Sequence, residues 1–228
     1  MSQKRVGVIG GGQLAWMMAT PAKKLGIKLI VQTPNPTDPA VAIADDVVLG
    51  AIDDAQATAK LAQKSDLITF ENEFINLSEL TKLAEQGVKF FPSLRSLSPL
   101  LDKYEQRKYC ASLDLPVPCF QALSKNNSDL DFPLVLKARR HGYDGQGTFI
   151  IPDADSLASM SKLCQQVPML LEEFIPFERE LAVMAARNQA GEIIIYPVVE
   201  TYQKEQVCRW VLVPAPINSF IVNQVKAI

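Results

Sequence analysis

One lysine and the glycine-rich stretch behind it are the residues of this chain best suited to bind phosphate. Lys137 ends an apolar run, and Gly142, Gly145 and Gly147 follow before the next apolar run begins at Thr148. Glycines at this spacing let successive backbone N–H groups point into one concavity, which is a typical phosphate nest. Lys137 adds a compact positive charge beside it. A flexible hairpin with a solvent-exposed lysine is the alternative that spacing alone leaves open.

Acidic residues further along the chain suit the sugar and base of a nucleotide. Glu172 and Glu173 end the apolar run that begins at Met169, and Glu180 follows soon after. A strand edge there offers backbone N–H and C=O groups to an adenine rim, and the carboxylates accept hydrogen bonds from ribose hydroxyls. A solvated acidic turn is the alternative, but the neighbouring Lys137 stretch favours nucleotide binding.

Three consecutive glycines, Gly10 to Gly12, separate an apolar run from a segment with helical spacing. Glycine permits positive φ and close approach to the backbone, and a helix N-terminus attracts anions. The pattern Gly10-x-Gly12-x-x-Ala15 also fits a dinucleotide fingerprint, but the second apolar run ends in Gln32 and Thr33, without the acid that such sites use for ribose. The turn therefore predicts an anion site, with an NAD(P) site and a tight turn without ligand as alternatives.

The first hundred residues alternate between strand-like and helix-like segments. The expected strands are 6–9, 29–31, 47–49, 67–70 and 88–91. The expected helices are 14–25, 54–64 and 77–86. This alternation predicts βαβ units and a parallel sheet. A Pro- and Ser-rich boundary at 92–99 then precedes a helix expected at 100–113.

The second half is richer in strands, so the whole chain is expected to be α/β with an α+β second part. Its expected strands are 120–123, 134–137, 148–151, 169–172, 180–187, 193–199 and 208–213. The strands 134–137 and 148–151 should form an antiparallel hairpin, and a turn at 188–191 should join the fifth and sixth. A helix is expected at 157–164.

Composition excludes several classes of partner. The net charge is −2 without a basic block, which argues against nucleic-acid binding. No apolar run approaches the roughly 20 residues that span a bilayer, so no membrane partner is expected. The four cysteines form no C-x-x-C pair and there is a single histidine, so no metal-ligating residues are assigned. Scattered thiols suggest a reducing, cytoplasmic location.

Five motifs occur in order along almost the whole chain. They are Gly10-Gly-Gly-Gln-Leu14, Thr69-Phe-Glu71-Asn-Glu73, Lys137 with Gly142-Tyr-Asp-Gly-Gln-Gly147, Glu172-Glu-Phe-Ile-Pro-Phe-Glu-Arg-Glu180, and Tyr196-Pro-Val-Val-Glu200. Together they resemble the ATP-grasp superfamily, and within it the family of 5-(carboxyamino)imidazole ribonucleotide synthases. The resemblance implies a Rossmann-like pre-ATP-grasp domain at 1–97. It further implies an ATP-grasp small (lid) subdomain with its linker helix at 98–175, and the start of the ATP-grasp C-terminal subdomain at 176–228.

The resemblance also implies roles for individual residues. Lys137 would contact the ATP phosphates, residues 142–148 would close over them, residues 172–175 would hold adenine, and Glu180 would hold the ribose. The implied ATP-binding residues are Lys103, Lys137, Gly142, Tyr143, Asp144, Gly145, Gln146, Gly147, Thr148, Glu172, Glu173, Phe174, Ile175, Glu180 and Gln203. The implied substrate-binding residues are Gly12, Gln13, Glu73, Tyr143 and Asp144, with Gln13 and the glycine turn near the substrate phosphate.

The implied activity is that of a carbon–nitrogen ligase of purine biosynthesis, producing ADP and phosphate. With ATP and Mg²⁺ it would convert bicarbonate to carboxyphosphate and then carboxylate the amine of 5-aminoimidazole ribonucleotide. Carboxyphosphate hydrolyses easily, so a lid that excludes water is needed. Full-length members of the family are commonly homodimers.

Three departures from the family pattern limit this expectation. Ala15-Trp16 stands where the family often has Gly-Arg, so a charge near the substrate phosphate is lost. Gln203 stands at a family histidine, and it donates hydrogen bonds but carries no charge. The family's Mg²⁺ ligands, a Glu and an Asn-Glu pair, fall beyond the position matched to Ile228, so little or no synthase activity is expected from these residues alone.

Other functions remain open at this stage. A related ATP-grasp ligase of the formate-dependent ribonucleotide transformylase type, or a carboxylase subunit, shares much of the pattern. A non-catalytic nucleotide-binding module would bind ATP without turnover. An NAD-binding protein is disfavoured by Gln32 and Thr33.

Overall fold

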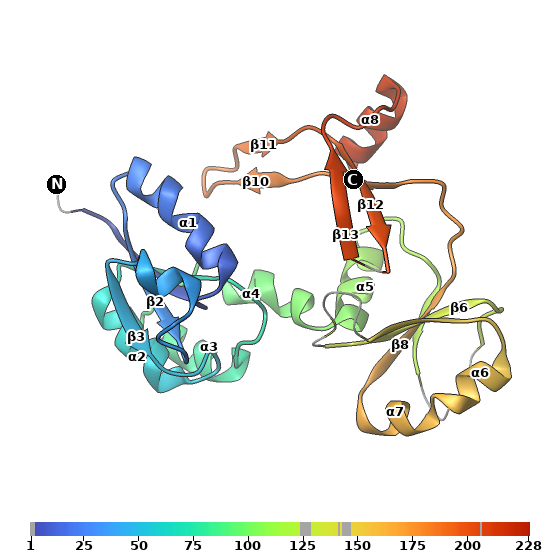
Figure 1. Cartoon of the computed structure of the whole chain (residues 1–228), viewed down its shortest axis with the longest axis horizontal. Helices are drawn as coiled ribbons and strands as arrows, with labels where there is room; N and C mark the ends of the chain where they lie inside the picture. Colours follow the sequence, from blue (N-terminus) through green and yellow to red (C-terminus); the bar gives the residue numbers. More distant parts are fainter. Residues whose placement is uncertain (1–2, 124–128, 141, 143–146, 206) are drawn as a thin grey trace. The chain divides into compact units, whose positions relative to one another are not determined.

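The computed structural model describes residues 3–123, 129–140, 142, 147–205 and 207–228. The chain divides into two units, Met1–Glu105 and Gln106–Ile228. The expected α/β class is confirmed, because a parallel-sheet unit is followed by one with antiparallel sheets (Figure 1). No helix in the described ranges has the length and apolar character that a bilayer crossing requires.

The first unit is built on a four-stranded parallel sheet. Its strands are β1 (Arg5–Ile9), β2 (Lys28–Thr33), β3 (Asp46–Leu49) and β4 (Leu67–Phe70), in the order β3-β2-β1-β4. Its helices are α1 (Gln13–Lys24), the 3-10 helix η1 (Pro39–Ala42), α2 (Ala55–Lys64) and α3 (Leu77–Glu85). The carboxyl ends of β1 and β4 are adjacent, which brings Glu71 close to the glycine turn.

Both faces of this sheet are covered. Successive residues of a strand point to opposite faces, so Val8 packs in the cluster formed with α1 and η1, whereas Ile9 packs against α2 and α3. On β2, Ile30 likewise packs in the cluster with α2 and α3, and Val31 packs in the cluster with α1 and η1. Burial on both faces explains why these strands are continuous apolar runs instead of alternating ones.

The prediction of a fifth strand at 88–91 is wrong. Phe90 makes only an isolated parallel bridge with Ile68. This bridge has two hydrogen bonds. The Ile68 N–H donates to the Lys89 carbonyl, and the Phe91 N–H donates to the Ile68 carbonyl. Pro92 follows at once, and because proline has no N–H it cannot extend the ladder.

Short helices follow, and the division between the two units falls inside the last of them. They are α4 (Leu94–Leu97), the 3-10 helix η2 (Ser98–Leu101) and α5 (Lys103–Ser112). The buried Asp102 precedes α5, and its Oδ1 accepts the N–H of Tyr104 at 3.0 Å. The helix expected at 100–113 is therefore confirmed, with its regular part beginning after this cap.

The second unit begins with an antiparallel sheet of four strands. They are β5 (Phe120–Ala122), β6 (Leu134–Ala138), β7 (Thr148–Ile151) and β8 (Met169–Glu173), in the order β5-β8-β6-β7. The expected β6–β7 hairpin is confirmed. Helices α6 (Ala154–Ser159) and α7 (Ser161–Gln166) lie along one side of the sheet (Figure 1). They replace the single helix expected at 157–164, because the backbone leaves the helical path at Met160.

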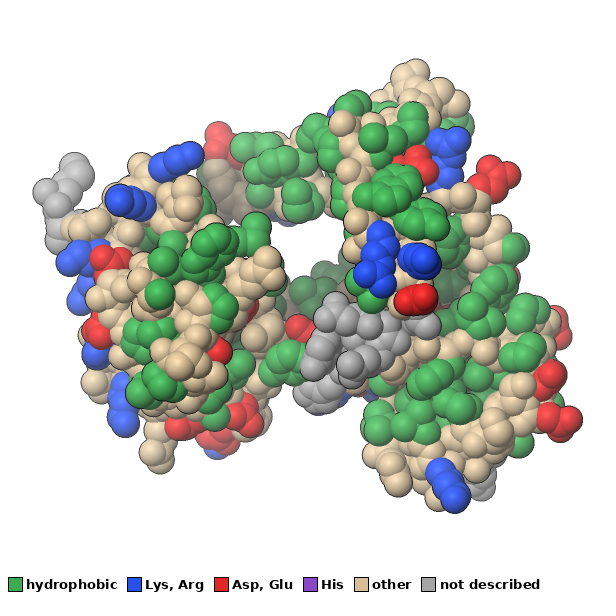
Figure 2. All heavy atoms as spheres, viewed as in Figure 1, with side chains coloured by type: hydrophobic (Ala, Val, Ile, Leu, Met, Phe, Trp, Pro, Cys, Tyr) green, Lys and Arg blue, Asp and Glu red, His purple; other side chains and the backbone are tan. Residues whose placement is uncertain are grey.

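The remaining strands differ in extent from those expected. The segments 180–187 and 193–199 are each interrupted, so β9 (Glu180–Ala182) pairs with β12 (Val199–Lys204), whereas β10 (Ala185–Arg187) pairs with β11 (Ile193–Ile195). The expected turn at 188–191 does join the hairpin. β13 (Val207–Leu212) completes the sheet β13-β12-β9, and α8 (Ser219–Ala227) follows. The three isoleucines of β11 are exposed, and Figure 2 shows apolar side chains gathered over this hairpin.

Candidate functional site

The two faces of the β5-β8-β6-β7 sheet have different chemistry. Leu136 and Leu171 lie in the apolar core beneath α6 and α7. Lys137 and Glu172 are the next residues along their strands, so they lie on the opposite face. In the β6–β8 register Lys137 is opposite Leu170 and Glu172 is opposite Val135, which makes the two charged residues diagonal neighbours.

Glu172 joins two cations on this face. Its Oε1 accepts a hydrogen bond from Nε of Arg107, on α5, and its Oε2 accepts one from Nζ of Lys137. The Glu172 side chain is 3% exposed, whereas the Arg107 and Lys137 side chains are 27% and 25% exposed. One enclosed carboxylate therefore holds two partly accessible cations, and the group of three has a net charge of one positive unit.

The ionisation of Glu172 depends on these two partners. Burial alone acts to raise the pKa of this carboxyl, but the hydrogen bonds from Arg107 and Lys137 and their positive charges outweigh burial and lower it. Glu172 is therefore a carboxylate at neutral pH, and it fixes the directions in which the two cations point. Sequence reasoning missed Arg107. Its position one helical turn after Lys103 on α5 was the signal available.

The base of the glycine-bearing hairpin adjoins Lys137. Thr148 is opposite Lys137 in the β6–β7 register, and the Ala138 N–H donates to the Gly147 carbonyl at 2.6 Å. Gly147 has φ +77°, and a Cβ there would lie 2.9 Å from the Cβ of Ala138. Glycine is therefore required where the loop rejoins the sheet. Of the other predicted loop residues, Gly142 is described, and Tyr143, Asp144, Gly145 and Gln146 lie outside the described residues.

The expectation that Glu172 and Glu173 lie on a strand edge is wrong. β8 lies inside the sheet, between β5 and β6. The Glu173 N–H donates to the Cys119 carbonyl at 2.9 Å, and the Glu172 carboxylate is bound to Arg107 and Lys137. Of the segment expected to hold adenine, only Phe174 and Ile175 lie past the end of the strand.

Two other predicted residues are brought together on the β13-β12-β9 sheet. Glu180 is directly opposite Thr201, and its Oε1 accepts hydrogen bonds from Oγ1 of Thr201 at 2.6 Å and Nε2 of Gln203 at 2.8 Å. The two donors orient the carboxylate. Gln203, expected to donate hydrogen bonds without carrying charge, donates here to the acid predicted to bind ribose.

The glycine turn of the first unit already holds an anion, and that anion belongs to the chain. The Gly12 N–H donates to Oε2 of Glu71 at 2.8 Å. The N–H groups of Leu14 and Ala15 donate to Oε1 of the same residue at 3.2 and 3.4 Å. The Gly12 N–H expected to face a substrate phosphate is therefore engaged by Glu71. The predicted residues Gln13 and Glu73 are both exposed.

The second strand carries no ribose-binding group. Gln32 is fully buried, and its amide nitrogen donates to the Ala51 carbonyl at 2.7 Å. Its amide oxygen accepts the Thr58 hydroxyl at 2.9 Å. The side chain at the usual position of a dinucleotide-binding acid is thus part of the core, which disfavours an NAD(P) site.

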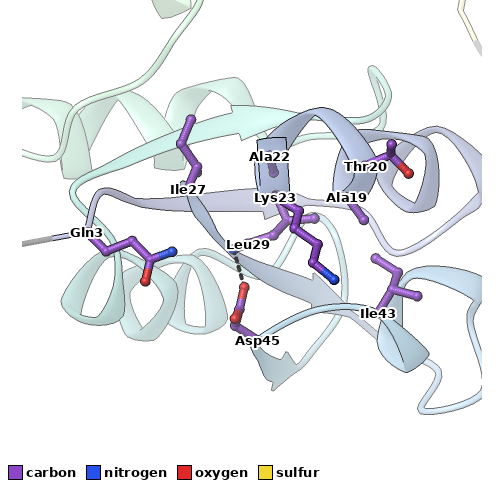
Figure 3. Close-up of a pocket in the computed structure, with 9 residues that line it drawn as sticks. All are labelled: Gln3, Ala19, Thr20, Ala22, Lys23, Ile27, Leu29, Ile43 and Asp45. Carbon is purple, nitrogen blue, oxygen red and sulfur yellow. Dashed lines mark hydrogen bonds between the residues drawn. The ribbon is translucent and has the colours of Figure 1, made fainter. Parts of the chain in front are cut away.

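A hollow of about 480 Å³ lies elsewhere on the first unit (Figure 3). It is lined by the second half of α1, the start of β2, Ile43 and Asp45, whose carboxylate accepts the Leu29 N–H at 2.8 Å. This is the amino end of the strands, whereas ligands of open parallel sheets bind at the carboxyl ends. None of the predicted site residues that the structure describes lines the hollow.

Among the residues that the structure describes, no three His, Cys, Asp or Glu side chains are grouped closely enough to hold a metal ion. The four cysteines are free thiols.

Comparison with known proteins identifies both halves of the chain. A family model described as an ATP-grasp domain matches residues 108–228. A second, described as a ribonucleotide synthetase preATP-grasp domain, matches residues 3–99. An N5-carboxyaminoimidazole ribonucleotide synthase of Synechocystis sp. is 59% identical over 217 residues, which are 95% of this chain and 56% of that protein.

Solved structures agree with this assignment. An ADP complex of an N5-carboxyaminoimidazole ribonucleotide synthetase matches with a TM-score of 0.93 at 30% identity, covering 100% of this chain and 62% of that one. An N5-carboxyaminoimidazole synthase from Aspergillus clavatus, in complex with ADP and 5-aminoimidazole ribonucleotide, matches with a TM-score of 0.87 at 28% identity. That match covers 99% of this chain and 60% of the other. The chain thus spans less than two thirds of the length of these relatives.

Proposed function

The chain belongs to the ATP-grasp family, and on this premise we propose that it serves the ATP- and bicarbonate-dependent carboxylation of 5-aminoimidazole ribonucleotide in purine biosynthesis. ATP would transfer its γ-phosphoryl group to a bicarbonate oxygen, giving ADP and carboxyphosphate. The amine of the ribonucleotide would then take the carboxyl carbon, releasing phosphate and a proton. The proposal is supported by the names of the relatives in both comparisons.

The observation that carries the nucleotide part is the cation pair held by Glu172. A lysine ammonium and an arginine guanidinium each have several donors, and Glu172 takes one from each. The exposed parts of Lys137 and Arg107 suit a polyphosphate, because the group keeps one net positive charge. Partial burial strengthens such an attraction relative to a fully solvated site.

The remaining ATP-binding roles are part of the same proposal. Gly147 and Thr148 would bring the hairpin loop over the phosphates beside Lys137. Phe174 and Ile175 would flank adenine. Glu180, oriented by Thr201 and Gln203, would accept from ribose. Lys103, the first residue of α5, is included by resemblance alone.

Magnesium ion is implied by the family chemistry, since Mg²⁺ offsets phosphate charge. The described residues do not fit a complete Mg²⁺ site, because they hold no group of three ligating side chains. The part assigned to this chain is therefore to bind and orient the nucleotide with its own cations.

The ribonucleotide is proposed to bind the first unit. Gln13 and Glu73 are exposed and offer an amide and a carboxylate to its polar groups. Gly12 lies in the same turn, and Tyr143 and Asp144 are included by resemblance alone. A cytoplasmic location and a homodimeric assembly complete the proposal.

The substrate assignment is tested by ligand-dependent thermal unfolding. A ligand that binds the folded state raises the unfolding temperature. We expect ATP and 5-aminoimidazole ribonucleotide to stabilise the chain, and the substrate of a formate-dependent ribonucleotide transformylase not to do so. Stabilisation by the transformylase substrate alone would move the chain to that related class of ligase. Stabilisation by ATP with neither ribonucleotide would reduce the proposal to nucleotide binding.

A further inference from the structure

Glu71 fills a position that a ligand anion would otherwise take. It follows β4, and its N–H donates to the Ile9 carbonyl at 3.0 Å, which fixes its backbone beside the end of β1. Both oxygens of its carboxylate are used, one by Gly12 and the other by Leu14 and Ala15. The first turn of α1 is therefore capped by a residue from a distant part of the chain.

Helix α1 has no cap of its own. Its N-cap residue is Gly12, which offers no side chain, and its first turn contains no acid. The N-terminal N–H groups of a helix need acceptors, and the helix dipole favours a negative charge at this end. Glu71 supplies both the acceptors and the charge.

The glycines of the turn are fitted to this carboxylate. A Cβ at Gly12 would lie 2.5 Å from Oε1 of Glu71. A Cβ at Gly10, where φ is +120°, would lie 2.6 Å from the Cβ of Glu71. Side chains at these two positions would therefore expel Glu71. The sequence pattern that predicts close approach of a ligand is explained by close approach of the chain's own acid.

We propose that Glu71 is the resident anion of the α1 N-terminus, a positioning residue that holds the Gly10–Gly12 turn and excludes ligand phosphate from the N–H groups of Gly12, Leu14 and Ala15. If the chain binds a ribonucleotide as proposed above, the phosphate of that ligand binds other groups. Removal of the Glu71 side chain opens a site for a small carboxylate.

Anion rescue tests this assignment. The Glu71→Ala and Glu71→Gln variants are compared with Glu85→Ala, which removes an exposed acid of the same unit. We expect Glu71→Ala to lower the unfolding temperature by about 10 °C, as loss of charged hydrogen bonds does in a unit of this size. Sodium formate, compared with sodium chloride at equal ionic strength, should restore a few degrees to Glu71→Ala alone. Equal effects of formate on all the proteins, or an undiminished unfolding temperature, would overturn the proposal.

A second measurement covers the case in which Glu71→Ala fails to fold. Hydrogen exchange at the amides of Gly12, Leu14 and Ala15 should be slow in the unaltered chain and at least about tenfold faster in Glu71→Gln, since a neutral amide side chain accepts less strongly. Unchanged exchange at these amides would contradict the assignment. Neither measurement involves ATP or the ribonucleotide. The role of Glu71 can therefore be refuted independently of the proposed function.

Discussion

The glycine turn of the first unit and the Lys137 face of the second both look like phosphate sites in the sequence, but they balance charge in opposite ways. At the turn, backbone donors meet a carboxylate from the same unit, and Glu71 satisfies them. On the Lys137 face, one carboxylate is shared by two cations, so positive charge is left over. A glycine-rich turn in a sequence indicates that some group approaches the backbone closely, but it does not identify that group. Two cations that share one counter-ion keep a positive charge that can bind an anionic ligand.

Removal of the Glu172 carboxylate should have a large effect on the stability of the second unit. In Glu172→Ala, Arg107 and Lys137 lose their common counter-ion while they remain partly buried. We expect the second unit to lose about 3 kcal/mol of unfolding free energy, as when one partner of a buried ion pair is removed. Urea unfolding measures this, with Glu178→Ala as an exposed-acid control. A loss no greater than that of the control would mean that Glu172 does not organise the face.

Arg107 is the second cation on Glu172, and it gives the group of three its net positive charge. We expect Arg107→Ala to weaken ATP binding about tenfold, the size of one lost hydrogen bond to a charged group. Arg107→Lys should weaken it less, since a positive charge remains without the planar donor geometry. Isothermal titration calorimetry gives both values. If Arg107→Ala bound ATP as tightly as the unaltered chain, Arg107 would serve only the ion network.

Acid should weaken the second unit through Glu172. Its pKa is lowered on folding from an ordinary value of 4.5, so below that pH the unfolded chain takes up the proton first. The stabilisation is therefore complete above about pH 4.5 and is lost as the pH falls through the lower pKa of the folded state. Urea unfolding at a series of pH values should show this decline in the unaltered chain and a shallower one in Glu172→Gln. Parallel curves for the two proteins would count against the ion network.

Sequence patterns predicted the scaffold better than the partners within it. The alternation of apolar and helical segments was enough for the parallel sheet, because its central strands β1 and β2 contain apolar runs that are buried on both faces. It failed at 88–91, where an apolar run is stopped by Pro92 after one bridge. The pattern of apolar residues within a segment does not show with how many other strands that segment will pair.

The pairings of Glu71 and Glu172 were beyond local pattern for a related reason. Lys137 and Glu172 meet because β6 and β8 are neighbours with one particular register, and Glu71 meets Gly12 because β4 lies beside β1. Strand order and register are tertiary properties. The sequence therefore drew attention to these charged residues and glycines, but it did not show which of them are in contact. The resemblance named Lys137, Glu180 and Gln203, whose roles in ATP binding stay predictions, and it did not name Arg107.

ATP titration of the Lys137→Ala variant measures whether the cations beside Glu172 hold the nucleotide. The variant is compared by calorimetry with the unaltered chain and with Lys162→Ala, which removes an exposed lysine of the same unit. We predict that Lys137→Ala lowers the affinity for ATP by about tenfold to a hundredfold, and that Lys162→Ala leaves it unchanged. Equal affinity in all three proteins would contradict the account, because the excess of positive charge beside Glu172 would then have no part in holding the nucleotide.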